Sequence, residues 1–170
     1  IEVSNTLVDF GNITLQTSKE NSFTIYNKSV LDLKISKIEV FNTLFEINEI
    51  FPIVIKSYKE IKIKFQPLNI GEVSSKIIIY SNDLSKPMTE IQMRAIGVTP
   101  DIFILPSSLN FGDISLGDTV QLPISISNLG IGNLKISSIK SSNSNFYLNY
   151  ESLEIPSKQT ENIKVFFKPI

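Results

Sequence analysis

The sequence of 170 residues contains no cysteine, no histidine and no tryptophan. Without cysteine, the chain forms no disulfide, no thiolate metal site and no cysteine nucleophile. Without histidine, it lacks the commonest general base and metal ligand, and every Ser-His triad is excluded. Arginine is almost absent: the sequence has one arginine, Arg94, and fifteen lysines, and its net charge is −1. Because phosphate-binding surfaces favour bidentate arginine, this composition argues against nucleic-acid binding.

Long hydrophobic runs are also missing. The longest apolar stretches, such as Ile77–Tyr80, have the length of a strand, whereas a membrane-spanning helix needs about 18 residues. The hydrophobic share of 42% is nevertheless enough for a packed core. The chain opens with Ile1 and shows no basic segment followed by an apolar one. We therefore expect no signal peptide within it and interpret it as a piece of a longer protein.

The residues that are present favour β-strands. Ile, Val, Phe, Tyr and Thr recur at period two, and clusters of turn residues interrupt the pattern. The range Glu60–Phe65 alternates apolar residues with lysines, and Leu31–Val40 shows a similar alternation that begins at Leu31. Ser57–Glu60 is interpreted as a turn, and no helical periodicity follows it. The pattern predicts an all-β protein.

One stretch of the sequence occurs twice, as Val8–Thr17 and as Leu109–Asp118, with the two Phe-Gly pairs 101 positions apart. Apolar positions then match apolar positions through the rest of each copy. One inserted residue raises the offset to 102, so that Phe65 corresponds to Phe167. The glycine of the first pair, Gly11, is expected to adopt a conformation that a side chain would obstruct.

A repeat of this length predicts two tandem domains, residues 1–99 and residues 100–170, joined at Gly97–Asp101. Because the junction is short and contains proline, we expect an end-to-end pair with limited hinge freedom. The second domain has no counterparts of Val73–Tyr80 and Glu90–Val98, its last two strands. Two interpretations stay open. Either the fragment ends there, or another chain or segment supplies the missing strands to an open sandwich.

The recurring motifs are [Leu/Val]-x-Phe-Gly-x-Ile-x-Leu, the following Leu-x-Ile-x-x-Ile, and Phe-x-Pro. Together with the range Ile124–Ile139, they resemble bacterial choice-of-anchor D repeats. These are similar to the abnormal-spindle/hydin-like (ASH) modules of eukaryotic cilia and centrosomes, and more remotely to major sperm protein and pilus chaperones. The resemblance implies seven-strand immunoglobulin-like sandwiches in a large multi-domain protein, which in bacteria is typically secreted or at the cell surface. It brings no catalytic residues.

Some repeated side chains are candidates for binding, although structural roles explain them too. The repeated phenylalanines fit core packing, with ligand stacking as the alternative. Asn27 and Asn128 fit turn chemistry. Asn12–Thr14 and Asn27–Ser29 match the N-glycosylation pattern. The phenylalanines in question are Phe10, Phe65, Phe111 and Phe167.

Three further groups have weaker signals. Asp113, Asp118 and Asn82–Asp83 offer oxygen ligands for a weak calcium site, although sandwich loops are commonly acidic. Gly130–Gly132 lies between strands with no helix after it, so a dinucleotide fingerprint fails. A lysine stripe fits a solvated strand face, with polyanion binding as the alternative; it consists of Lys56, Lys59, Lys62 and Lys64.

The sequence thus predicts a non-catalytic module with no catalytic, cofactor-binding or metal-binding residue. We expect a tandem immunoglobulin-like spacer or binding arm of a larger secreted or cell-surface protein. Its partner would be a protein, through self-association or strand exchange at the incomplete second domain, with no nucleic acid and no membrane insertion. Two alternatives remain: accessory domains of a secreted enzyme, or an intracellular ciliary or centrosomal scaffold.

Overall fold

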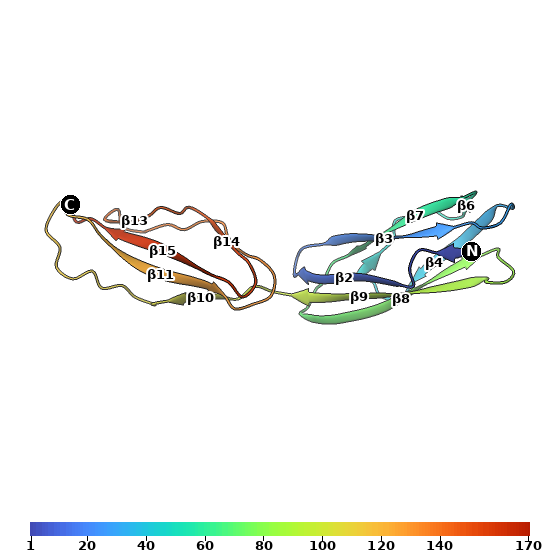
Figure 1. The fold of residues 1–170 in the computed structure, drawn as a ribbon, viewed down its shortest axis with the longest axis horizontal. Helices are drawn as coiled ribbons and strands as arrows, with labels where there is room; N and C mark the ends of the chain where they lie inside the picture. Colours follow the sequence, from blue (N-terminus) through green and yellow to red (C-terminus); the bar gives the residue numbers. More distant parts are fainter. The chain divides into compact units, whose positions relative to one another are not determined.

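The computed structural model describes residues 1–170, which form fifteen β-strands and no helix (Figure 1). The all-β prediction is confirmed. The chain divides into two compact units, Ile1–Val98 and Thr99–Ile170, called unit one and unit two below. No segment forms a helix long and apolar enough to cross a bilayer.

Unit one consists of two β-sheets that enclose a core. The four-stranded sheet has the order β1-β3-β7-β5, and the five-stranded sheet has the order β2-β9-β8-β4-β6. The strands are β1 (Glu2–Val3), β2 (Leu7–Thr14), β3 (Lys19–Tyr26), β4 (Leu33–Val40), β5 (Phe45–Glu46), β6 (Ile53–Ile55), β7 (Tyr58–Phe65), β8 (Gly71–Ser81) and β9 (Met88–Val98).

The period-two alternation places one face of each sheet of unit one in the core. On β7, Ile61, Ile63 and Phe65 are fully buried, and the intervening lysines point away from the core. Two local predictions are wrong. Tyr58 already belongs to β7, so Ser57–Glu60 is not a separate turn, and β4 begins at Leu33 with Leu31 exposed.

The first segment of unit one forms two strands, β1 and β2, in different sheets, which explains the break in its apolar pattern. β1 pairs with β3 in one sheet, whereas β2 runs parallel to β9 in the other, with an irregularity between Asp9 and Asn12. Gly11 lies in this irregularity at φ +67° and donates its N–H to the Asp9 carboxylate at 2.9 Å. Its counterpart Gly112, at φ +68°, bonds Asn110 in the same way. The predicted special conformation of Gly11 is confirmed.

Unit two repeats one sheet of unit one and only part of the other. Its four-stranded sheet has the order β10-β11-β15-β13, matching β1-β3-β7-β5, and β12 pairs only with β14, as β4 pairs with β6. The strands are β10 (Ile102–Leu105), β11 (Val120–Asn128), β12 (Leu134–Ile136), β13 (Phe146–Leu148), β14 (Leu153–Ile155) and β15 (Thr160–Phe167).

No strand of unit two takes the places of β8 and β9, as the sequence predicted. In unit one, β2 pairs only with β9, and β4 pairs with both β8 and β6. Accordingly, residues 108–115, which correspond to β2, form no strand, and β12 has three residues where β4 has eight. A backbone segment becomes a strand only where its N–H and C=O groups find a partner.

Candidate interaction surfaces

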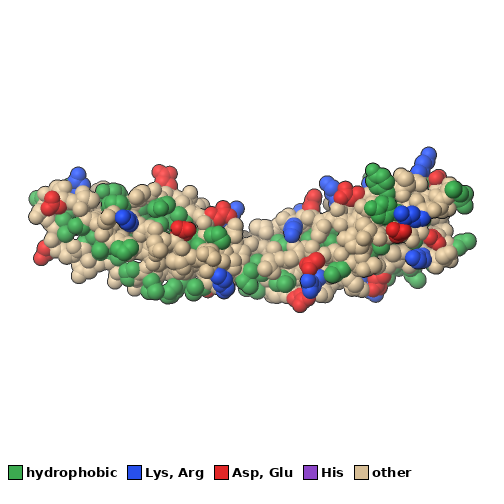
Figure 2. Space-filling view, viewed as in Figure 1, with side chains coloured by type: hydrophobic (Ala, Val, Ile, Leu, Met, Phe, Trp, Pro, Cys, Tyr) green, Lys and Arg blue, Asp and Glu red, His purple; other side chains and the backbone are tan.

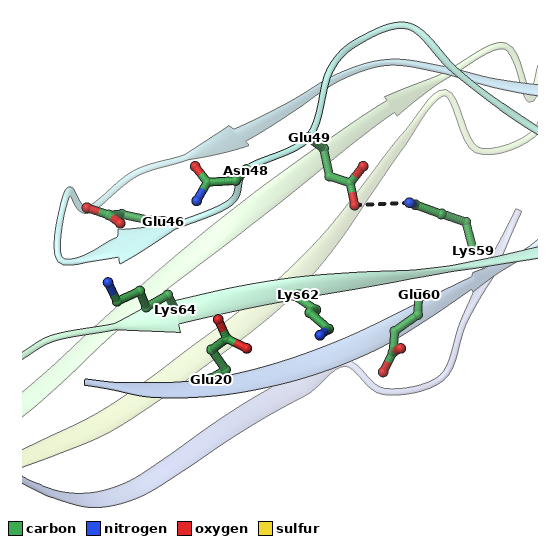
Figure 3. A pocket seen from close by; sticks show the side chains of 8 residues that line it. All are labelled: Glu20, Glu46, Asn48, Glu49, Lys59, Glu60, Lys62 and Lys64. Atoms are coloured by element: carbon green, nitrogen blue, oxygen red, sulfur yellow. Dashed lines mark ion pairs between the residues drawn. The ribbon is translucent and has the colours of Figure 1, made fainter. Parts of the chain in front are cut away.

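The outward face of the four-stranded sheet of unit one contains a charged hollow of about 460 Å³ (Figure 3). Its side chains come from β3, β5 and β7 and from the segment after β5. The Lys59 ammonium pairs with Glu49 at 3.2 Å, and Ser22 donates to Glu60 at 2.6 Å. The lining residues are Glu20, Glu46, Asn48, Glu49, Lys59, Glu60, Lys62 and Lys64.

Carboxylates therefore lie between and beside the lysines of the stripe predicted from the sequence. Lys62 and Lys64 lie opposite Ser22 and Glu20 on β3, and Lys64 also lies opposite Glu46 on β5. Because positive and negative groups are interspersed, the hollow does not concentrate one sign of charge, which argues against polyanion binding. No cluster of three or more His, Cys, Asp or Glu side chains in the structure is arranged to hold a metal ion.

The inner face of unit two carries an aromatic trio that repeats the trio of unit one. Phe111, Phe146 and Phe167 have ring centroids 5.6, 5.5 and 4.7 Å apart. The corresponding distances in unit one are 5.5, 5.7 and 4.6 Å. The trio of unit one is fully buried, whereas each ring in unit two is only half-buried. The same side chains thus lack a cover in unit two.

The core of unit two is open for the same reason. Eighteen buried residues make up the core cluster of unit one, but only Ile126, Leu134, Ile155 and Ile163 make up that of unit two. Ile104 lies on the core face of β10, directly opposite Ile126, yet it is 43% exposed.

Asn27 directly follows β3 and Asn128 is the last residue of β11, and both bond backbone groups from several segments. The Asn128 amide donates to the Gly132 and Ile155 carbonyls at 2.8 and 3.0 Å, and its oxygen accepts the Asp101 and Gly130 N–H groups at 3.1 Å each. The bond from Gly130, two residues further on, is turn chemistry, whereas the bonds with Asp101 and Ile155 join segments 27 positions away. Turn chemistry is therefore only part of the role of Asn128. The bonds to distant residues could not be inferred from the sequence.

Asn27 makes equivalent bonds, which bear on the glycosylation pattern. Its amide nitrogen donates to the carbonyls of Leu31, Ile55 and Lys56 at 2.8, 3.0 and 3.3 Å. A sugar attached to this nitrogen would replace one of its hydrogens where three carbonyls converge. Asn12, in contrast, is exposed on β2. Of the two sequence matches, the structure leaves only Asn12 available.

The residues considered for a calcium site fall into two groups: Asn82 and Asp83 bond the protein backbone, and Asp113 and Asp118 are exposed. Asn82 bonds the backbone of Lys34 and Asp32, and Asp83 accepts the N–H groups of Ser85 and Lys86. These bonds stabilise the β8–β9 loop. The other two predicted oxygen ligands, Asp113 and Asp118, are exposed in the segment between β10 and β11.

Gly130 has a packing role. A Cβ atom at Gly130 would collide with the backbone of Thr99–Asp101, so only glycine permits the β11–β12 loop to lie against the start of unit two. Leu129 and Ile131 donate to the Asp101 and Thr99 carbonyls at 2.7 and 3.0 Å along this contact.

One ion pair connects β2 and β9 of unit one. Arg94 on β9 donates to the Asp9 carboxylate on β2 at 2.6 Å. The hydrogen bond from the guanidinium, followed by that from the Gly11 N–H, lowers the pKa of Asp9. On β4, hydrogen bonds from Lys37 and Tyr80 lower the pKa of Glu39.

The comparison with known families decides the identity of the fold. The family description "HYDIN/CFA65/VesB-like, Ig-like domain" matches residues 1–96. The chain belongs to this Ig-like domain family. The predicted relationship to abnormal-spindle/hydin-like domains is thereby confirmed, and membership of an Ig-like family is consistent with a non-catalytic interaction module. No curated protein matches the sequence.

A solved structure with a TM-score above 0.5 has the same fold, and two others are similar at lower scores. The ASH/PapD-like domain 7 of human CEP192 has a TM-score of 0.52 at 13% identity, covering 59% of this chain and 86% of that chain. A protein of unknown function from Porphyromonas gingivalis W83 has a TM-score of 0.49 at 14% identity, covering 98% and 82%. The secreted serine protease VesC of Vibrio cholerae has a TM-score of 0.43 at 12% identity, covering 94% and 45%.

Proposed function

We propose that this chain is a non-catalytic protein-interaction module in a larger secreted or cell-surface protein. Residues 1–99 and 100–170 act as two Ig-like domains, a spacer or binding arm of the choice-of-anchor D type. Membership of the Ig-like family supports this role. The sequence also contains no histidine, the most frequent general base, and no cysteine, a common catalytic nucleophile. The interaction takes place through unit two, by β-strand complementation.

The half-buried aromatic trio of unit two carries this proposal. In unit one, the rings of Phe10, Phe45 and Phe65 are buried within a core to which β8 and β9 contribute Ile77, Ile79, Ile91, Met93 and Ala95. Burial of a large apolar side chain contributes about 1.5–3 kcal/mol. A partner that brings an equivalent hairpin to unit two gains this stabilisation several times over.

Unit one also supplies the register for such a partner. β4 pairs with β8 through Ile38 and Ile79, and β2 pairs in parallel with β9 through Val8 and Met93. The corresponding backbone of unit two lies at Ile139 and in residues 108–115. The donor is therefore a β-hairpin whose first strand runs antiparallel to β12 and whose second strand runs parallel to residues 108–115. Main-chain bonds provide affinity, and alternate apolar side chains provide specificity.

The donor is a protein segment, and a second copy of this chain serves only by exchanging the β8–β9 hairpin that its own unit one holds. A sheet that leaves backbone groups unpaired is a template for another strand. Unit one has its own hairpin in place, so it is the internal control for every measurement on unit two.

The test appends residues 69–98 of this same chain directly after Ile170, where the repeat alignment places them in register. We expect amide hydrogens in Leu109–Ser115 and Leu134–Lys140 to become protected from exchange, as they do when a segment joins a sheet. A control carries asparagine in place of both Ile77 and Ile79 in the appended copy only. Equal protection with and without the appended hairpin, or equal protection in the control, would refute strand complementation.

A further inference from the structure

The second face of the four-stranded sheet of unit two points away from the core and is nearly uncharged. Side chains alternate outward on its two central strands, from Gln121 to Ser127 on β11 and from Thr160 to Phe166 on β15. Among these outward positions, only Lys164 carries a charge. The face is distinct from the aromatic trio, which lies on the inner side of the same sheet.

The equivalent face of unit one is strongly charged, so the two repeats differ at this place. Outward positions of β3 and β7 include Glu20, Glu60, Lys62 and Lys64. Figure 2 shows charged and hydrophobic side chains over both parts of the chain, so the difference concerns this sheet face and not unit two as a whole. Because the fold is the same, folding alone does not require the uncharged face.

One cross-strand site shows the difference most clearly. In unit one, Glu46 lies opposite Lys64. In unit two, the same site has Tyr147 opposite Phe166, with ring centroids 4.9 Å apart and planes 9° from parallel. Tyr147 remains 45% exposed. Exposed aromatic side chains in place of charges are typical of binding surfaces.

Hydroxyl and amide groups follow the same face away from this aromatic pair. Ser125 donates to the Asn162 side chain at 2.6 Å, and the Ser127 and Thr160 hydroxyls lie 2.7 Å apart. Each hydroxyl both donates and accepts, so these pairs retain capacity for further hydrogen bonds. Phe103 and Leu105 on β10 border the face and are 44% and 54% exposed.

The size and charge of the face limit what binds it. The four strands have four, nine, eight and three residues, and at about 3.3 Å per residue and 4.8 Å between strands they span roughly 400 Å², less than the roughly 800 Å² per partner of a standard protein interface. A lone lysine does not attract a polyanion. A peptide that pairs with a sheet as an additional strand joins its edge and not its face. A narrow, uncharged, linear ligand rich in hydroxyl groups fits the size, the charge and the hydrogen-bonding groups of this face.

We propose that the outward face of the β10-β11-β15-β13 sheet binds a neutral polysaccharide chain. The electron-rich ring face that Tyr147 turns away from Phe166 contacts the C–H groups of a sugar ring. The hydroxyl and amide groups of Ser125, Asn162 and Thr160 bond the sugar hydroxyls. This activity goes beyond the proposed protein interaction and uses the opposite side of the sheet.

The experiment measures sedimentation of the full chain with insoluble cellulose, insoluble chitin and starch granules. The test variant, Tyr147→Glu with Phe166→Lys, introduces the residue pair that unit one has at this site, and hydrogen exchange of β11 and β15 checks that unit two stays folded. We expect the unmodified chain to bind at least one of the three polysaccharides and the variant to bind it at least tenfold more weakly. Tyr58→Ala removes a 68% exposed tyrosine from unit one and should leave binding unchanged.

Three results would overturn the proposal. The first is no retention on any of the three polysaccharides. The second is equal retention of the unmodified chain and the double variant. The third is a double variant that keeps polysaccharide binding but loses self-association in light scattering, which would make the face a protein interface. Strand complementation is tested separately by the appended hairpin, because these substitutions lie on the other side of the sheet.

Discussion

Replacing Asn128 by alanine tests how unit two is held together. The side chain is completely buried, the only buried polar one in the chain. Its four bonds connect the end of β11 to the start of unit two at Asp101, to the following loop, and to Ile155 on β14. Alanine removes all four bonds and leaves a small cavity at the end of β11.

The expected loss follows from the environment of the four partners. A buried polar group without a partner costs about 1–3 kcal/mol. The bond to Ile155 is buried, whereas the other three are partly accessible to water, so water restores part of their loss. We therefore expect Asn128→Ala to destabilise unit two by about 3–5 kcal/mol. With four residues in its buried cluster, unit two has little to offset this.

Hydrogen exchange followed by mass spectrometry provides the assay, because it reports on β11 and β15 separately from the strands of unit one. The control is Asn133→Ala, which removes a single exposed bond to Glu154 at 2.8 Å and should cost less than about 0.5 kcal/mol. If Asn128→Ala destabilised β11 and β15 no more than the control does, the reasoning would be refuted.

Two further predictions concern unit one. The Arg94 guanidinium lowers the pKa of Asp9, so the pair contributes stability at neutral pH that is lost as pH falls through this lowered pKa, below about pH 4. Asp9→Asn should flatten that acid dependence in urea unfolding at pH 7 and pH 3, and an unchanged dependence would contradict it. In a eukaryotic secretory host, mass spectrometry should find glycans on Asn12 and none on Asn27. A glycan on Asn27 in folded protein would contradict the role of its amide.

Much of the fold was predictable because it depends on local patterns. The alternation along Ile61–Phe65 identified a buried face, and the repeated Phe-Gly pair identified Gly11 as a special backbone position. The constant offset between the repeats predicted that unit two has no β8 or β9. These inferences need only the period of a strand and the comparison of one copy with the other.

The surfaces were less predictable because they depend on strands far apart in the sequence. The lysines of β7 looked like a basic stripe, yet β3 and β5 place Glu20 and Glu46 opposite Lys64. Asn27 matched both a turn and a glycosylation site until the carbonyls of Leu31, Ile55 and Lys56 were located around its amide. Cross-strand partners are known only once the register is known.

Light scattering on the unmodified chain and on the chain with residues 69–98 appended tests the central claim most directly. If the open inner face of unit two receives strands from another copy of this chain, the unmodified chain associates as its concentration rises, and the appended chain stays monomeric. A chain that remains monomeric at every concentration, or one whose association the appended hairpin does not change, would contradict interaction between copies through this face.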